Sequence, residues 1–382
     1  MRNNRIAWIA VALAALLVWQ RDALLHAGPK PDIAPRPERR VLRVWVCEGW
    51  TGSTAWLERQ CALFERAHPG VNLRMRRAQP SELTDEGAVL PDVLLFAPGV
   101  LADPEPLLSP LHGELPVRAE LAASGRWRGR QWGVPVAMGG YALLVNREGY
   151  PDPEQPTLDR QSLAAAARPA HGKQPARYAL QCAGGEVLAH PAALLAQGGA
   201  LRGGWPQGIA ALRGGETLPH DFALCTPDKA YADFTARRAM ALLGTQRDIR
   251  KFSALAETGK GFDFRVEPAQ QAFTDQLLLA GILRGAEDSA LESLCATLLR
   301  QLVGAEAQQA LVAYGLFPVR SDVPGYDAEA TPWLHAMAQS LAAEDIWVPN
   351  AFAWSGQRSD FLARVDMALA QGDVDLWIDE IW

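Results

Sequence analysis

Apolar and polar positions alternate in blocks after residue 40 of the chain. Residues 41–47 (VLRVWVC) are apolar at nearly every position, which is typical of a strand buried on both faces of a parallel sheet. Apolar residues at helical spacing over 55–68 predict a helix, which Pro69-Gly70 ends. Residues 71–75 and 91–97 resume as strands. This strand–helix–strand order predicts an α/β fold with a parallel sheet covered by helices.

Two glycines separate two apolar strands further along the chain. Residues 131–137 and 141–146 have strand character, and Met138-Gly139-Gly140 lies between them. The segment is too short for a helix, and glycine adopts backbone dihedrals that other residues resist. One interpretation is a tight turn in an antiparallel pair, and the other is a crossing between two lobes. The place of the segment, after one α/β unit and before a second, favours the crossing.

Helical spacing dominates the second half of the chain. Residues 316–319 are expected to be extended, and a loop at 347–354 (WVPNAFAW) interrupts a helix-rich end over 332–382. Residues 229–243 are expected to run from a helix into a short strand before Gly244. The other predicted helices cover 161–168, 191–198, 270–283, 289–302 and 305–314.

The N-terminus has the pattern of an export signal. Arg2 and Arg5 precede an unbroken apolar run over 6–19. Residues 1–27 are therefore a signal peptide or an uncleaved membrane anchor, because the run is short for a spanning helix, which needs about 20 residues, and the cleavage site is weak. The proline-rich residues 28–40 predict a tether. The flanking positive charges place the body at the outer face of the cytoplasmic membrane, or in the periplasm or outside the cell after cleavage.

Composition narrows the function classes. The 382 residues suffice for two domains, and the net charge of -6 gives no electrostatic support for nucleic-acid binding. The cysteines and histidines are scattered without metal-like spacing, so no metal or other cofactor is expected. The cysteines are buried thiols or form disulfides, for example between Cys182 and Cys225. The sequence lacks G-x-S-x-G, H-E-x-x-H and a Gly-rich phosphate loop, so no enzyme activity is predicted.

Four segments of the sequence carry a family resemblance. VLRVWV with FERAHPGVNLRM is similar to a strand, a helix ending "F-E-x-x-x-P-G-V" and a second strand. PDVLLFAPG is similar to a "P-D-V" strand, and GRWRGRQWGVPVAMGGYALLVNRE to paired "G-K-x-Y-G-x-P" and "L-x-Y-N" strands. FTARRAMALLG and VGAEAQQALVAYGLFPVRSD are similar to "F-x-x-G-x-A-A-M" and "Q-x-x-x-x-x-x-G-x-x-P" segments. In this order, over about 41–325, the segments resemble the carbohydrate-type extracellular solute-binding proteins of ABC importers, which are maltose-binding-protein-like.

The resemblance implies an architecture. It is a two-lobed, periplasmic-binding-protein-like type II fold with a ligand cleft between the lobes, preceded by the N-terminal signal or anchor helix. Residues 41–137 with 268–312 would form lobe one, and residues 138–267 with 313–382 would form lobe two.

The resemblance also implies a function. The protein would be a monomer that captures a small solute, best matched by a sugar or oligosaccharide, and delivers it to the transmembrane subunits of an ABC permease. The alternative is a membrane-tethered ligand sensor or scaffold of the same fold without a transport role. No cysteine that could be lipid-modified directly follows the apolar run, and this absence favours the alternative over a typical importer component. A hydrolase that uses Glu48 or Asp92 is the least favoured hypothesis.

Ligands of open α/β sheets lie beyond the carboxyl ends of the strands, often at helix N-termini. A sugar needs a flat aromatic ring against its C–H face and polar groups in the plane of its hydroxyls. Each candidate also has a structural interpretation: core packing for the tryptophans and Tyr141, helix capping for Glu48, and a surface charge for Arg247. The predicted ligand-binding residues are Glu48, Trp50, Thr51, Gly99, Gly140, Tyr141, Trp205, Thr245, Gln246, Arg247 and Trp354.

Overall fold

The computed structural model describes residues 40–47, 52–85, 87, 89–149, 178–182, 225–268, 274–285, 289–342, 346–354 and 356–358. The predicted signal or anchor, nearly all of the tether and the helices predicted at 161–168 and 191–198 lie outside the described residues. None of the described helices is long and apolar enough to cross a membrane. The chain divides into two compact units, and the larger, Val41–Pro69 with Leu73–Trp382, contains the sites below.

The first sheet is mixed and has buried strands at its centre. Its strand order is β2-β1-β3-β12-β4, and β7 also pairs with β12. β1 and β3 are parallel, whereas β12 runs antiparallel to β3, β4 and β7. The strands are β1 (Arg40–Cys47), β2 (Val71–Arg77), β3 (Val93–Phe96), β4 (Leu108–Ser109), β7 (Val134–Met138) and β12 (Leu277–Leu283).

Helices and a hairpin accompany the first sheet. α2 buries Trp56, Leu57 and Phe64, and the indole N–H of Trp56 donates to the carbonyl of Ala307 at 2.9 Å. This bond joins two helices that are far apart in sequence. The elements are α2 (Thr54–Ala67), η1 (Pro80–Thr84), α3 (Ala119–Ala123), β5 (Arg126–Trp127), β6 (Arg130–Gln131), α9 (Ser289–Leu302), α10 (Ala305–Ala310) and η4 (Leu311–Tyr314).

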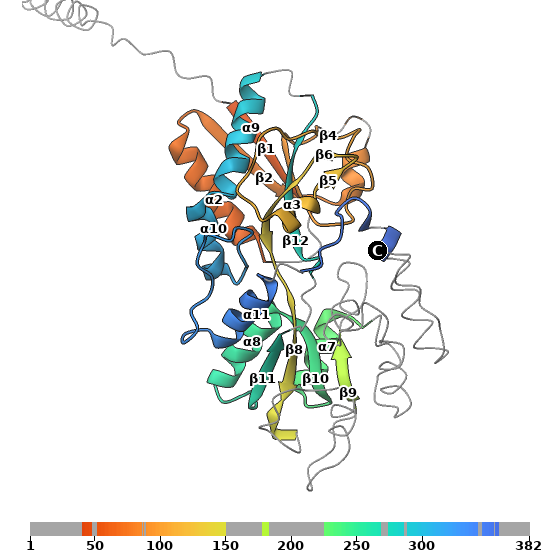
Figure 1. Cartoon of the computed structure of the whole chain (residues 1–382), viewed down its shortest axis with the longest axis vertical. Helices are drawn as coiled ribbons and strands as arrows, with labels where there is room; N and C mark the ends of the chain where they lie inside the picture. The colour runs from red at the N-terminus through yellow and green to blue at the C-terminus, as the bar shows by residue number, and fades with distance from the viewer. Residues whose placement is uncertain are drawn as a thin grey trace, which may run out of the picture. The chain divides into compact units, whose positions relative to one another are not determined.

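The second sheet has the order β11-β8-β10-β9 (Figure 1). β8 is antiparallel to β10 and β11, whereas β9 pairs with β10 in parallel. An aromatic cluster fills the core beneath it, with Phe252 at 4.6–5.1 Å from the rings of Phe234, Phe262 and Phe264. The elements are β8 (Tyr141–Asn146), η2 (Arg147–Gly149), β9 (Tyr178–Cys182), α7 (Pro227–Thr235), β10 (Ala239–Thr245), α8 (Gln246–Glu257), β11 (Phe264–Pro268) and α11 (Pro332–Leu341).

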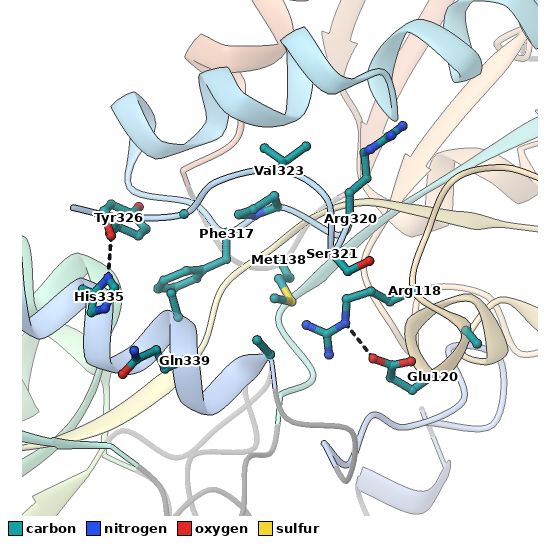
Figure 2. Close-up of a pocket in the computed structure, with 15 residues that line it drawn as sticks. Arg118, Glu120, Met138, Phe317, Arg320, Ser321, Val323, Tyr326, His335 and Gln339 are labelled. Carbon is teal, nitrogen blue, oxygen red and sulfur yellow. Dashed lines mark hydrogen bonds and ion pairs between the residues drawn. The ribbon is translucent and has the colours of Figure 1, made fainter. Parts of the chain in front are cut away.

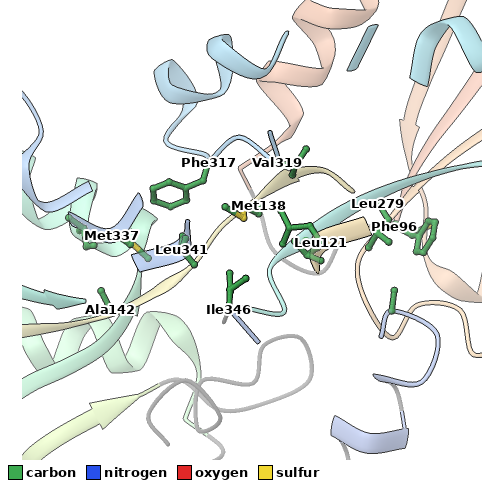
Figure 3. Close-up of a cluster of buried hydrophobic side chains, with 14 of the residues drawn as sticks. Phe96, Leu121, Met138, Ala142, Leu279, Phe317, Val319, Met337, Leu341 and Ile346 are labelled. Atoms are coloured by element: carbon green, nitrogen blue, oxygen red, sulfur yellow. The ribbon is translucent and has the colours of Figure 1, made fainter. Parts of the chain in front are cut away.

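The chain passes between the two sheets at Gly139-Gly140. β7 ends at Met138 in the first sheet, and β8 begins at Tyr141 in the second, so the predicted crossing is confirmed and the tight turn is wrong. The chain returns between β11 and β12. Buried side chains continue from Phe96 and Leu279 past Met138 to Leu341 (Figure 3). The exact lobe boundaries stay a prediction.

Two helix predictions need correction. The helix expected at 270–283 is wrong, because residues 277–283 form β12, in which every residue is buried. A fully buried strand has no face-to-face alternation, so its apolar run resembles a helix. The helix expected from residue 229 ends at Thr235, and a strand occupies 239–245. Arg237, with a φ of 59°, makes the turn between them. The helix predicted at 289–302 is confirmed as α9.

Candidate functional site

Every backbone polar group of Gly139-Gly140 is hydrogen-bonded. The Gly139 N–H donates to the carbonyl of Gln276 at 2.7 Å, and its carbonyl accepts from Thr274 Oγ1 at 2.8 Å. The Gly140 N–H donates to Gln246 Oε1 at 3.0 Å, and its carbonyl accepts from Gln276 Nε2 at 3.0 Å. Because unpaired buried backbone groups are costly, these side chains hold the crossing in one arrangement.

Close packing, rather than an unusual backbone angle, explains the two glycines. Neither is among the residues with positive φ, so the expectation of special dihedrals is wrong. A Cβ at position 139 would lie 2.5 Å from Gln246 Nε2 and 2.6 Å from Gln276 Oε1. At position 140 it would lie 2.7 Å from Leu341 Cδ1. The crossing is therefore enclosed on both sides, by amides at one glycine and by α11 at the next.

A buried carboxylate connects the crossing to the loop near the C-terminus. Tyr141 donates its hydroxyl hydrogen to Asp275 Oδ1 at 2.7 Å, and the Trp354 indole N–H donates to Asp275 Oδ2 at 3.1 Å. All three side chains are at most 4% exposed. Burial, and then the charge of Asp275, raise the pKa of Tyr141 well above its ordinary value. Tyr141 therefore stays a hydrogen-bond donor, and the three residues form one unit.

The loop that carries Trp354 also contacts the end of β3. The Gly99 N–H donates to the carbonyl of Ala351 at 2.7 Å. Asn350 Oδ1 accepts from the Phe352 N–H at 3.0 Å, which shapes the turn before Trp354. The Phe352 ring packs 5.9 Å from the ring of Phe96. The loop thus brings Gly99 and Trp354 to the same part of the molecule.

Thr245 and Arg247 lie at the start of α8. Thr245 is the N-cap, since its Oγ1 accepts from the Arg247 N–H at 3.3 Å. Asp248 completes the capping box by accepting from the Thr245 N–H at 2.8 Å. Burial raises the pKa of Asp248, which the two hydrogen bonds from Thr245 oppose. The Arg247 side chain is exposed.

The structure brings together part of the predicted ligand-binding set. Gly140, Tyr141, Gln246 and Trp354 surround Thr274, Asp275 and Gln276, which the sequence analysis missed. Their signal was a polar Thr-Asp-Gln run directly before the apolar 277–283. The run was missed because the helix predicted over 270–283 enclosed it, whereas a strand begins only at residue 277. Glu48, Trp50, Thr51 and Trp205 lie outside the described residues, and a role in ligand binding stays a prediction for all eleven.

Exchange of Asp275 for asparagine is expected to lower the free energy of unfolding by about 1–3 kcal/mol. The amide presents an N–H₂ group to one of the two donors, Tyr141 or Trp354, where the carboxylate accepts from both. Urea unfolding would measure the effect. Tyr141→Phe is the matched comparison and should lose a similar amount, about 1–3 kcal/mol, because it leaves one oxygen of the buried Asp275 carboxylate without its donor. Equal stability of Asp275→Asn and wild type would contradict the role of Asp275.

Comparisons with known proteins place the fold. In sequence, the chain matches no family model and no curated protein. Maltose-bound MalE3 of T. maritima is 16% identical, with a TM-score of 0.64, over 89% of this chain and 97% of that one. The galacto-N-biose-/lacto-N-biose I-binding protein of a Bifidobacterium longum ABC transporter, in complex with lacto-N-biose, is 11% identical, with a TM-score of 0.63, over 90% and 94%. Thiaminase I of Bacillus thiaminolyticus is 14% identical, with a TM-score of 0.59, over 87% and 99%.

These similarities define the class of fold. The chain has the two-lobed, periplasmic-binding-protein-like fold of the maltose-binding proteins, and the fold predicted from the four sequence segments is confirmed. The similar structures include maltose- and maltodextrin-binding proteins, the sugar-binding protein of an ABC transporter, and the enzyme thiaminase I.

Proposed function

We propose that the protein is an extracytoplasmic solute-binding protein that captures a sugar or oligosaccharide in a cleft between its lobes. The observation that carries this proposal is the fold, which is similar to that of sugar-binding proteins over 87–90% of the chain. The passage of the chain between the two sheets at Gly139-Gly140 supports it, because binding proteins of this architecture close two lobes around their ligand. Lobe one would be 41–137 with 268–312, and lobe two 138–267 with 313–382.

The predicted ligand-binding residues divide into two roles in this proposal. Tyr141, Gln246 and Trp354 are at most 3% exposed, so they would hold the crossing and the adjacent loop in place. Contact with the solute would fall to Gly99 and Arg247, which are not buried, and to predicted residues outside the described ranges. Capture needs no covalent step, since the solute stabilises the closed state by binding it more tightly than the open state.

Delivery to an ABC permease and tethering by the N-terminal helix complete the proposal. The N-terminal pattern of the sequence supports export, and one similar structure is a component of an ABC transporter. Sugar uptake by cells that contain the chain and the permease encoded beside it would test delivery. A membrane-tethered sensor would bind the sugar equally well and leave uptake unchanged when the chain is deleted.

We infer binding rather than catalysis, although thiaminase I shares the fold. A cysteine nucleophile must form a thiolate near neutral pH. Burial raises the pKa of Cys47 and Cys61 to about 11 and that of Cys295 to about 12. These three thiols therefore remain protonated and are poor nucleophiles.

Cys61 should react with iodoacetamide about 100-fold more slowly in the folded protein than after unfolding in urea at pH 8. Its pKa of about 11, against 9.0 for an ordinary thiol, lowers the thiolate fraction by this factor. The rate should rise tenfold per pH unit up to about pH 11, because thiolate forms as pH approaches the raised pKa. Mass spectrometry of the peptide that contains Cys61 would measure the rate. Equal rates in folded and unfolded protein would show that the thiol is not suppressed.

Sugar binding can be tested by thermal unfolding and calorimetry. Maltose and lacto-N-biose, the sugars of two similar structures, would be added to the folded protein. At a concentration 100 times the Kd, a bound sugar stabilises the protein by about 2.7 kcal/mol, which raises Tm by several degrees. No stabilisation by these sugars or a wider set of oligosaccharides, with folding confirmed by circular dichroism, would overturn the proposed function.

A further inference from the structure

A cavity lies beside the crossing, and Met138 at the end of β7 contributes to its wall. Its volume is about 630 Å³, within the range of about 300–1,000 Å³ that is usual for small-molecule sites. The walls come from the start of α3, the end of β7, the segment 317–326 and α11 (Figure 2). None of the seven predicted ligand-binding residues that the structure describes lines it.

Arg118 supplies a buried positive charge in the wall of this cavity. Its side chain is only 7% exposed. Nε donates to Glu120 Oε1 at 2.6 Å, and Nη1 donates to the carbonyl of Leu341 at 2.7 Å. Nη2 is buried and has no hydrogen-bond partner among the residues that the structure describes. Figure 2 shows the guanidinium extending from α3 toward Met138. An unpaired buried N–H₂ of a charged group is costly, so this geometry favours an acceptor supplied by an occupant.

The rest of the wall is mainly apolar, although Ser321, His335 and Gln339 also line it. Met138, Phe317 and Val323 contribute apolar surface. His335 Nδ1 lies 2.6 Å from the carbonyl oxygen of Tyr326. A carbonyl oxygen can only accept, so Nδ1 carries the hydrogen of this bond. The occupant therefore needs a sizeable apolar body.

The charges of the wall limit the charge of the occupant. Glu120 neutralises part of the Arg118 charge, and Arg320 is paired with Asp322 through two hydrogen bonds. One guanidinium N–H₂ is left to bind an anion. A single carboxylate matches this donor, whereas a multiply charged phosphate would lie close to the Glu120 carboxylate and be repelled.

We propose that this cavity is a second ligand site, which binds a small organic monocarboxylate with an apolar body. The carboxylate accepts from Arg118 Nη2, and the apolar body lies against Met138 and Phe317. Nη2 is covered by its neighbours, so binding includes a small shift of the side chains around it. The site does not depend on capture of a sugar.

Isothermal titration with 3-phenylpropionate would test the site in the full-length protein. We expect one site per chain, at least tenfold weaker binding of the neutral 3-phenylpropanamide, and no displacement of the probe by inorganic phosphate. No binding of 3-phenylpropionate, equal binding of the amide, or displacement by phosphate would overturn the proposal.

Three variants test whether the probe binds in this cavity or elsewhere on the protein. Arg118→Gln should weaken the probe at least tenfold, whereas Glu120→Gln should strengthen it several-fold because it removes the opposing charge. Ala338→Phe fills the cavity from α11 without removing any side-chain hydrogen bond, so it should abolish binding even if Arg118→Gln proves too unstable to measure. Unchanged affinity in Glu120→Gln and Ala338→Phe, with folding confirmed by circular dichroism, would contradict the assignment.

Discussion

Alanine at position 139 is expected to destabilise the folded protein by about 2–4 kcal/mol. The new methyl group would lie 2.5 Å from Gln246 Nε2 and 2.6 Å from Gln276 Oε1, and both amides are almost fully buried. Neither amide can move away without losing its hydrogen bond to Gly140. The urea midpoint of unfolding would measure the loss.

Gly325→Ala is the matched control for this experiment. Its added methyl group would meet only the Cβ of Ala338, at 3.7 Å, which is ordinary van der Waals contact. Its stability should stay within about 0.5 kcal/mol of wild type. A Gly139→Ala variant as stable as Gly325→Ala would show that the two amides can move apart, and the proposed rigidity of the crossing would be wrong.

Replacing Gln308 by methionine is expected to cost about 3–5 kcal/mol, although the two side chains have similar volumes. Gln308 is fully buried on α10. Its Nε2 donates to the carbonyls of Val136 and Leu302 at 2.7 Å each, and its Oε1 accepts from the Val319 N–H at 2.8 Å. Methionine would leave these three backbone groups without the amide that joins β7, the end of α9 and the segment after η4.

Gln301→Met provides the comparison for Gln308→Met. Gln301 is half-buried on α9, and its Nε2 donates to the backbone carbonyl of Gln60 at 2.9 Å. Loss of this partly exposed bond and of the longer contact with the Gln60 side chain should cost about 1 kcal/mol. Urea unfolding of both variants gives the difference directly. Similar losses in the two would mean that water or a rearranged backbone replaces the Gln308 amide.

The architecture was largely predictable from sequence, because it depends on local patterns. The apolar residues of 41–47 and the helical spacing of 55–68 correspond to β1 and α2. The order of strands and helices then favoured a crossing at Gly139-Gly140, and the family resemblance implied the two lobes. The strand at 277–283 was not predictable in this way, since all its side chains are buried and its partners β3, β4 and β7 lie more than 130 residues earlier.

The candidate site was predictable only in part. Strand ends and glycines nominated Gly140, Tyr141 and Gln246, which do lie together. Asp275 was missed because no local rule indicates that a carboxylate will be buried between Tyr141 and Trp354. Arg118 was missed for a similar reason. Its burial depends on contacts with the distant Leu341 and Val319, which appear only after the chain has folded.

The position of β12 has a consequence for the order of folding. β12 comes from Leu277–Leu283, yet it lies between β3 and β4 and also pairs with β7. Among the described strands, β4 and β7 pair with no other strand, so neither has its partner while the ribosome has made only the N-terminal part of the chain. Pairing across such long separations is slow. We expect β4 and β7 to stay unpaired in the nascent chain until the ribosome has passed residue 283. A polypeptide in this unfolded state can still be translocated through a membrane.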